Sequence, residues 1–198
     1  PPVAVLAPIE WPADLVDAFA VLPIQEGGRV KPLATYARFQ LLAINGKTSV
    51  KMPKGFTPAS RPAMEWLLDC LFFPAVASTQ RCFQVIDDEV LHGVGYGVEG
   101  RRKRDWYSYL ELLPVRAALM QRADEFKNVE PKMRSTVQVQ TLRLASGILD
   151  FEYAIHALDI GREAIDVTAV PAVSKLFDGK EHIRFSEAVA KALQLGML

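Results

Sequence analysis

The residues with the clearest chemical potential form one short segment, Gly27-Gly28-Arg29-Val30-Lys31-Pro32. Paired glycines allow backbone dihedrals that other residues avoid, and two cations flank Val30 within the segment. A helix is expected to begin directly after it, and the free backbone N–H groups at a helix start attract anions. The segment therefore fits an anion pocket, or equally a structural turn whose cations pair with a local carboxylate such as Glu26.

A second segment, Gly95 to Gly100, has the G-x-G-x-x-G spacing of dinucleotide-binding loops. That chemistry needs an amphipathic helix opening on the glycines, but Arg101-Arg102-Lys103-Arg104 follows with no apolar helix period. The basic run could instead contact phosphates, lipid heads or an acidic protein, with Trp106 nearby for stacking. Because 23 Lys and Arg balance 23 Asp and Glu, a solvated loop is favoured and nucleic acid is not an expected partner.

The histidines His92, His156 and His182 are scattered and match no metal-ligand spacing. His156 is the one candidate haem or metal ligand, because it lies beside the apolar seam of a long predicted helix. A packed or solvated histidine is the commoner outcome at such a flank. Neither a G-x-S-x-G elbow nor a group typical of a nucleophilic triad is visible, so the sequence predicts no catalytic residue.

The spacing of Cys70 and Cys82 matches neither C-x-x-C nor C-x-x-C-H, so the chain is not itself a c-type cytochrome. Cys70 lies within an apolar helix pattern, which favours a buried free thiol. One disulfide between the two residues stays open as the alternative for an exported protein.

The strongest structural signal is a pair of helices in the second half of the chain. Ser108 and Glu111 have the S-x-x-E spacing of a capping box, and apolar residues at three-four spacing continue the helix. From Val137 onward, apolar residues alternate steps of four and three. A connection of about four residues forces two long helices antiparallel. We therefore expect a coiled-coil-like hairpin over about 109–127 and 132–158.

The rest of the chain fits a mainly α fold. Residues 1–10 are expected to form an extended arm, and shorter helices are expected over 12–20 and 33–44. The one convincing strand lies near 82–87 and gives at most a small β element. No internal repeat is apparent.

With 198 residues, 50% of them hydrophobic, the chain can bury one substantial core. We expect a single extracytoplasmic domain over 1–198, in which 162–198 form a C-terminal extension. No apolar stretch reaches the roughly 20 residues that a membrane-spanning helix needs.

The segment Leu22-Pro23-Ile24-Gln25-Glu26-Gly27-Gly28-Arg29-Val30-Lys31-Pro32-Leu33-Ala34-Thr35 resembles a motif of known proteins. That motif, P-V-Q-D-G-G-R-x-K-P-L-x-T-F-A-R, opens the extracytoplasmic region of large cytochrome c biogenesis proteins of the CcsA/ResC type. The likeness continues at pattern level over roughly residues 20–190. The positions that match residue by residue are Gly27, Gly28, Arg29, Lys31, Pro32 and Thr35, and Tyr36 stands where the family has Phe. The family's tryptophan-rich haem-binding motif and its membrane histidines have no counterpart in this chain.

The resemblance implies a domain on the periplasmic or extracytoplasmic face of a membrane, within a membrane-anchored parent that exports haem and helps attach it to apocytochromes. On this basis we expect a non-catalytic domain that docks apocytochrome c or other cytochrome c maturation subunits. The parent complex would act as a holocytochrome c synthase and handle haem, while this domain would hold no cofactor. The alternative is a haem-binding or small-anion-binding domain that uses His156 or the Arg29/Lys31 turn.

Overall fold

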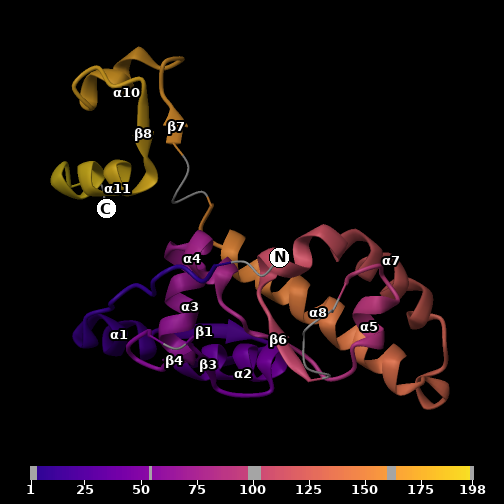
Figure 1. Ribbon diagram of the computed structural model, residues 1–198. Helices are drawn as coiled ribbons and strands as arrows, with labels where there is room; N and C mark the ends of the chain where they lie inside the picture. The colour runs from indigo at the N-terminus through magenta and orange to yellow at the C-terminus, as the bar shows by residue number, and fades with distance from the viewer. Residues whose placement is uncertain (1–3, 54, 98–103, 160–163, 197–198) are drawn as a thin grey trace. The chain divides into compact units, whose positions relative to one another are not determined.

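The computed structural model describes residues 4–53, 55–97, 104–159 and 164–196 (Figure 1). The fold is mainly α, as predicted. The chain divides into two compact units, Pro1–Ile155 and His156–Leu198. The second unit includes residues 162–198, the expected C-terminal extension.

The first unit combines helices with very short strands, and residues 4–12 precede its first helix without regular structure. Its elements are α1 (Ala13–Ala20), β1 (Pro23–Glu26), β2 (Arg29–Pro32), α2 (Leu33–Asn45), β3 (Ser49–Lys51), β4 (Ser60–Pro62), α3 (Ala63–Phe72), α4 (Pro74–Thr79), β5 (Phe83–Val85), α5 (Glu89–His92), β6 (Asp105–Tyr107), α6 (Tyr109–Leu112), the 3-10 turn η1 (Leu113–Val115), α7 (Arg116–Lys127), the 3-10 turn η2 (Pro131–Met133) and α8 (Thr136–His156).

One supersecondary unit recurs: an antiparallel hairpin whose second strand leads directly into a helix. It occurs in β1–β2 with α2, in β3–β4 with α3 and in β5–β6 with α6. The residue between strand and helix has extended dihedrals in each copy, at Pro32, Pro62 and Ser108. An extended N-cap lets a strand pass into a helix without a loop, and proline suits this position because a helix start leaves its N–H groups unpaired.

These hairpins correct one expectation, that of a single small β element near 82–87. Strand β5 confirms the predicted strand, and all of these strands span only three or four residues, too few for an alternating pattern to appear. The connections also differ widely, from Gly27-Gly28 in the first hairpin to residues 52–59 in the second. A repeat with such unequal connections leaves no fixed period in the sequence.

The core of the first unit surrounds α3, which is buried except at Glu65, Leu71 and Phe72. Trp66, Leu68 and Cys70 of this helix are 0% exposed. Phe151 of α8 packs beside α3 and lies edge-on to Phe83, with ring centroids 5.4 Å apart. A helix covered over most of its surface needs little polar face, which explains the nearly continuous apolar run of α3.

The predicted pair of long helices is broken in its first member. Pro114 lies in η1, between α6 and α7, because proline lacks the N–H that a continuous helix would use there. In contrast α8 is one helix of 21 residues, and its buried Leu144, Ile148, Phe151 and Ile155 follow the predicted steps of four and three. The structure thus establishes the helices of this region, but not a continuous hairpin over 109–127 and 132–158.

The predicted capping box at the start of α6 is confirmed. The Glu111 N–H donates to Ser108 Oγ at 3.2 Å, and the Ser108 N–H donates to Glu111 Oε2 at 2.8 Å. Both residues are at least 97% buried, since their exposed fractions are 1% and 3%. Water therefore cannot replace these hydrogen bonds.

We expect Ser108→Ala to lower the free energy of unfolding by about 1–2 kcal/mol, because the Glu111 N–H loses its acceptor at a buried helix start. Urea denaturation measures the change. Ser108→Thr keeps the hydroxyl acceptor and should cost less. An equal loss in both variants would mean that packing, and not the capping hydrogen bond, sets the effect.

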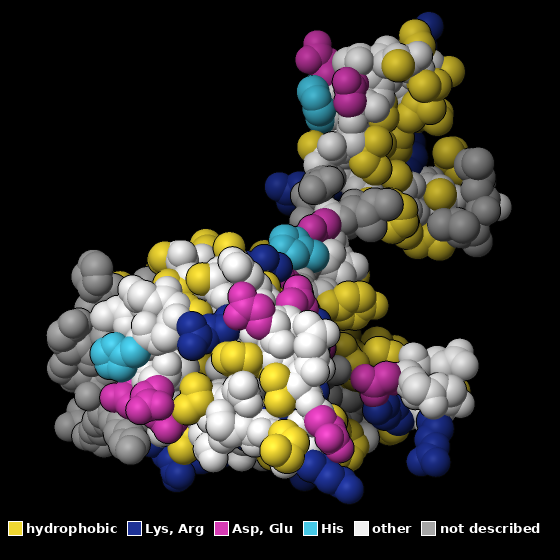
Figure 2. Space-filling model, turned by 90° about the vertical axis from the view of Figure 1, so that its right-hand side faces the viewer, with side chains coloured by type: hydrophobic (Ala, Val, Ile, Leu, Met, Phe, Trp, Pro, Cys, Tyr) yellow, Lys and Arg dark blue, Asp and Glu magenta, His cyan; other side chains and the backbone are white. Residues whose placement is uncertain are grey.

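The second unit contains a fourth hairpin and helix. Its elements are β7 (Ala164–Asp166), α10 (Pro171–Leu176), β8 (His182–Arg184) and α11 (Phe185–Gln194), with β7 and β8 antiparallel. Among its described residues, Val167 and Ile183 are the buried hydrophobic side chains. Large apolar side chains at Val170, Phe185 and Leu193 are exposed, and Figure 2 shows hydrophobic side chains over much of the visible face of this unit.

Over the residues that the structure describes, no helix combines the length and the apolar composition needed to cross a bilayer.

Candidate functional site

The Gly27-Gly28 pair forms the two-residue connection of the β1–β2 hairpin. Its φ angles are 57° and 76°, both positive as in a type I′ turn, and Glu26 pairs across the hairpin with Arg29. A Cβ added at either glycine would meet no atom within 4 Å, so conformation and not space requires glycine here. The unusual dihedrals were predicted, but not the two strands that the turn joins.

The cations of this segment do not converge on a pocket. Lys31 forms an ion pair with Glu26, and its Nζ lies 5.6 Å from the centroid of the Phe39 ring. Arg29 is exposed, Pro32 is the N-cap of α2, and Thr35 lies in the first turn of α2. The local pairing of Lys31 is the structural alternative that the sequence left open.

The other sequence candidates also lie apart. Arg101, Arg102 and Lys103 lie outside the described residues, and Arg104 is exposed. The side chain of His156 is 64% exposed, and its Nδ1 lies 2.7 Å from Asp159 Oδ2. An exposed histidine that contacts a carboxylate in solvent has the surroundings of a surface residue. A histidine held in a haem cleft would have different surroundings.

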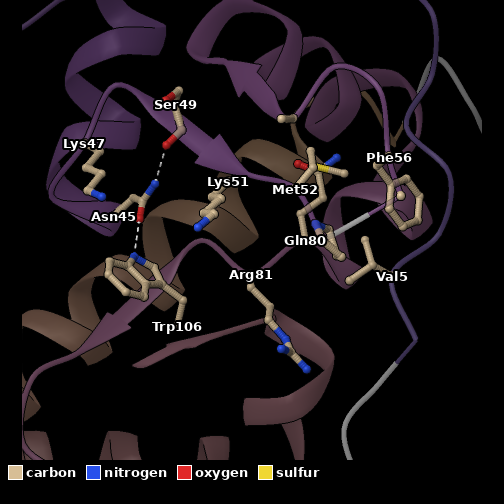
Figure 3. Close-up of a pocket in the computed structure, with 13 residues that line it drawn as sticks. Val5, Asn45, Lys47, Ser49, Lys51, Met52, Phe56, Gln80, Arg81 and Trp106 are labelled. Carbon is tan, nitrogen blue, oxygen red and sulfur yellow. Dashed lines mark hydrogen bonds between the residues drawn. The ribbon is translucent and has the colours of Figure 1, made fainter. Parts of the chain in front are cut away.

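A cavity of about 540 Å³ lies in the first unit between the β3–β4 hairpin and β6, and we call it the Trp106 pocket. Figure 3 shows Trp106, Asn45, Ser49 and Lys47 on one side of it, and Met52, Phe56 and Val5 on the other. Its described lining residues are Val5, Asn45, Lys47, Ser49, Lys51, Met52, Pro53, Gly55, Phe56, Ala59, Gln80, Arg81 and Trp106. Its volume is within the range of cavities that hold small ligands.

The charge of the Trp106 pocket is positive. Lys47, Lys51 and Arg81 line it, and none of its described lining residues is Asp or Glu. Arg81 Nη2 reaches Glu111 Oε1 at 3.2 Å behind the pocket. None of the ion pairs between described residues uses Lys47 or Lys51. An anion entering the pocket would therefore meet two ammonium groups that form no ion pair with a carboxylate in the described part of the chain.

Trp106 is fixed by a short chain of hydrogen bonds. Its indole Nε1–H donates to Asn45 Oδ1 at 2.6 Å, and Asn45 Nδ2 donates to the Ser49 carbonyl at 2.7 Å (Figure 3). Lys47 Nζ lies 5.2 Å from the centroid of the indole ring. The hairpin, the end of α2 and β6 are thereby tied together, and the indole face is held beside a cation.

A buried ionic network supports the back of the pocket. The side chains of Arg61 and Asp69 are 2% and 0% exposed, and Arg61 donates to both carboxylate oxygens of Asp69 at 2.9 and 2.6 Å. Gln80 Nε2 donates to Asp69 Oδ2 at 2.8 Å, and the indole of Trp11 donates to Asp69 Oδ1 at 2.8 Å. Arg61 also donates to the Ile9 carbonyl at 2.7 Å. The network therefore holds both Gln80 in the pocket wall and the segment that precedes α1.

The two cysteines are buried free thiols, as the helix pattern of Cys70 favours. Burial raises the pKa of Cys82 to about 12. Burial also raises the pKa of Cys70 well above its usual value, with the neighbouring Cys82 and Asp69 adding to the shift. Both groups are therefore protonated and unreactive near neutral pH.

Because the pKa of Cys82 is raised, the free energy of unfolding falls as the pH rises through the alkaline range. The stability that the protonated thiol contributes is complete below the usual thiol pKa near 9 and is lost as the pH rises toward 12, because the unfolded chain releases the proton first. We expect the difference in unfolding free energy between wild type and Cys82→Ala to shrink by up to about 1.4 kcal/mol per pH unit above that point. Urea denaturation from pH 8 to 11 measures it, and a constant difference would contradict the assignment.

The Trp106 pocket has features of a binding site for a ligand with both an anionic and an apolar part. Over the described residues, no group of three or more His, Cys, Asp or Glu side chains is placed to hold a metal ion. Sequence reasoning missed the pocket, because its lining is spread from residue 5 to residue 106 and follows no spacing. The available signals were the Lys47 and Lys51 pair and Trp106, which lies close to the basic run in the sequence.

Comparison of the chain with protein-family models, with curated proteins and with solved structures gave no match in any of the three searches.

Proposed function

We propose that this chain is a non-catalytic docking domain on the extracytoplasmic face of a membrane, within a cytochrome c assembly factor of the CcsA/ResC type. The likeness of residues 22–35 to the opening motif of that family supports the assembly context. The parent chain is membrane-anchored and handles haem, and this domain docks apocytochrome c or another maturation subunit without a cofactor.

The observation that carries the docking role is the Trp106 pocket. Lys47 Nζ lies over the Trp106 indole, Lys51 lines the same pocket, and Met52 and Phe56 supply an apolar wall. Aromatic, methionine and cationic side chains are the groups enriched at the centres of protein interfaces. The pocket therefore takes an acidic side chain together with an apolar neighbour from the docked protein.

The helices α6, α7 and α8 form the scaffold of the domain and, in this proposal, one kinked antiparallel hairpin. Contacts at the base support this pairing: Arg116 Nη2 donates to Glu152 Oε2 at 2.6 Å, and the Tyr109 hydroxyl donates to Glu152 Oε1 at 2.8 Å. Farther along α7 and α8 lies a cavity of about 470 Å³, with Met120 and Leu149 in its wall. The hairpin thus offers a second surface for maturation subunits.

Biolayer interferometry with immobilised domain tests the proposal. Apocytochrome c, and separately the extracytoplasmic domains of the other maturation subunits, serve as analytes, and holocytochrome c is the control. We expect at least one of them to bind the wild type and to bind Trp106→Ala at least about tenfold more weakly, because an indole at an interface centre contributes about 2 kcal/mol or more. Binding that is unchanged in Trp106→Ala, or no binding by any analyte, would contradict the docking role.

The second candidate is a haem-binding or small-anion-binding domain, favoured by the positive charge of the Trp106 pocket. An absorbance titration with haem separates the two. The docking proposal predicts no Soret shift in the wild type. A shift that disappears in His156→Ala would support the notion of an iron ligand, and a shift lost in a Lys47→Ala/Lys51→Ala variant would place the haem propionates in the pocket.

A further inference from the structure

The helix α8 carries a second row of mostly apolar side chains, on the face that does not meet the core. Val139, Leu149 and Tyr153 of this row are 50%, 48% and 72% exposed. The complete row, which we call the outer row, runs in alternating steps of three and four: Val139, Leu142, Ser146, Leu149 and Tyr153. Single exposed apolar side chains are common on proteins, but this spacing over about four turns is that of a helix that packs along another helix.

The outer row borders a groove between α7 and α8. The cavity of about 470 Å³ has Leu142, Ser146 and Leu149 in its wall, together with Met120 and Ala123 of α7. Ser146 is small and exposed, so a side chain of another helix can insert at its position. A helix that lies along the outer row would thus fill the groove with side chains of its own.

Two opposite charges flank the outer row on one side. Arg143 and Asp150 are seven residues apart, so they lie on the same side of α8. Neither takes part in an ion pair between described residues, and Arg143 Nη2 donates to the Ala43 carbonyl at 3.3 Å. Burial and the charge of Glu26 raise the pKa of Asp150. A cation brought beside Asp150 would therefore be favourable.

The outer row is complementary to itself when two copies of α8 pair antiparallel. In the usual antiparallel register, Ser146 faces Leu149 of the second copy, and Leu142 faces Tyr153 of the second copy. Each layer then combines a smaller side chain with a larger one, as close packing requires. The same layers recur on the other side of the twofold axis, because the contact uses one surface twice.

The flanking charges are complementary in the same register. Antiparallel helices bring equivalent flanks together, so Arg143 lies beside Asp150 of the second copy, and Asp150 beside Arg143 of the second copy. A parallel pair brings opposite flanks together and leaves these two charges apart. The charge pattern therefore selects the antiparallel direction.

We propose that α8 pairs antiparallel with α8 of a second copy of this chain, through the outer row. The contact buries Leu142, Leu149 and Tyr153, and two Arg143–Asp150 ion pairs fix its direction. The outer row is about 21 Å long, which covers less area than a standard stable interface, so the dimer is weak. This inference goes beyond the docking function of the Trp106 pocket, and it names a second copy as the maturation subunit on the hairpin surface.

Sedimentation equilibrium of the chain from about 1 µM to about 500 µM tests the pairing, since this range spans the dissociation constants of weak interfaces. We expect the average mass to rise from that of a monomer toward that of a dimer. Leu149→Glu should weaken the dimer at least about tenfold, because it places a carboxylate in the apolar seam. The matched control is Leu113→Glu in η1, whose side chain is similarly exposed, at 45%, and which should dimerise as the wild type does.

Exchanging the charges tests the direction of the pairing. Arg143→Asp and Asp150→Arg should each dimerise about tenfold more weakly than the wild type, because each variant brings like charges together twice. An equimolar mixture of the two variants should dimerise about as well as the wild type, since every pair in the mixed dimer again joins opposite charges. Fluorescently labelled Arg143→Asp with unlabelled Asp150→Arg shows the mixed dimer by sedimentation velocity. Leu149→Glu and Leu113→Glu decide the question if Asp150→Arg fails to fold.

The contrary outcomes are equally definite. A wild type that stays monomeric over the whole range, or equal losses in Leu149→Glu and Leu113→Glu, would overturn the pairing through the outer row. A mixture that dimerises no better than its two components would overturn the antiparallel direction. Trp106→Ala should dimerise as the wild type does, so a failure of the pairing leaves the docking function of the Trp106 pocket in place.

Discussion

Replacing Asp69 by Ala is expected to lower the free energy of unfolding by about 3–5 kcal/mol. The variant leaves the Arg61 guanidinium, whose side chain is 2% exposed, without the carboxylate that accepts from it twice. The same change removes the acceptors of the Trp11 indole and of Gln80 Nε2. A buried charge that loses its only fully buried partner cannot be solvated without opening the core, so the effect is large.

Urea denaturation followed by far-UV circular dichroism measures the loss. Asp69→Asn keeps the size of the side chain and one acceptor, and should cost less than Asp69→Ala. Glu65→Gln is the matched control on the same arginine, because Glu65 accepts from Arg61 Nη1 at 2.7 Å but its side chain is 24% exposed. It should cost at most about 1 kcal/mol. Equal losses for Asp69→Ala and Glu65→Gln would show that the buried pair is not the anchor of this region.

Reversing both unpaired charges of the pocket, in Lys47→Glu/Lys51→Glu, is expected to weaken binding of the docked protein about a hundredfold. Each lysine loses a charge-assisted hydrogen bond, which contributes about 1.5–3 kcal/mol, and each new carboxylate repels the acidic group. The stability should change little, because Lys47 and Lys51 are exposed and take part in none of the ion pairs between described residues.

The matched control is Lys132→Glu/Lys175→Glu, which changes the net charge equally but lies in η2 and in α10, outside the lining of the Trp106 pocket. It should alter affinity by less than about threefold at 0.15 M salt, because charges beyond a Debye length of about 8 Å are screened. If both double variants weaken binding to the same degree, overall charge and not the Trp106 pocket attracts the partner.

Local signals in the sequence predicted several elements correctly, because they depend on neighbours along the chain. The capping box of Ser108 and Glu111 joins residues only three positions apart in the sequence. The apolar steps of α8 likewise follow from helix geometry alone. The same locality explains why the Gly27-Gly28 turn could be predicted without its hairpin.

The remaining features depend on contacts between distant residues. In the Trp106 pocket, the side chain of Trp106 is hydrogen-bonded to Asn45, which is far from it in the sequence. The pocket wall also depends on Asp69, and the apolar helix pattern around Asp69 gives no sign of its partner Arg61. The sequence shows Pro114 near the start of the first predicted helix, but packing decides whether proline bends a helix or ends it. Of the two alternatives for the Arg29 and Lys31 segment, an anion pocket or a structural turn, the pairing of Lys31 with Glu26 favours the turn, and that pairing also depends on the hairpin.

The central claim, that the Trp106 pocket receives the docked protein, is tested most directly by the indole resonance of Trp106. In a 1H-15N correlation spectrum of the 15N-labelled domain, the Nε1–H peaks of Trp11, Trp66 and Trp106 are assigned with single Trp→Phe variants. We expect unlabelled apocytochrome c, or the maturation subunit that binds in its place, to shift or broaden the Trp106 peak. The peak of the fully buried Trp66 should stay unchanged. A Trp106 peak that does not move at saturating partner would contradict the claim.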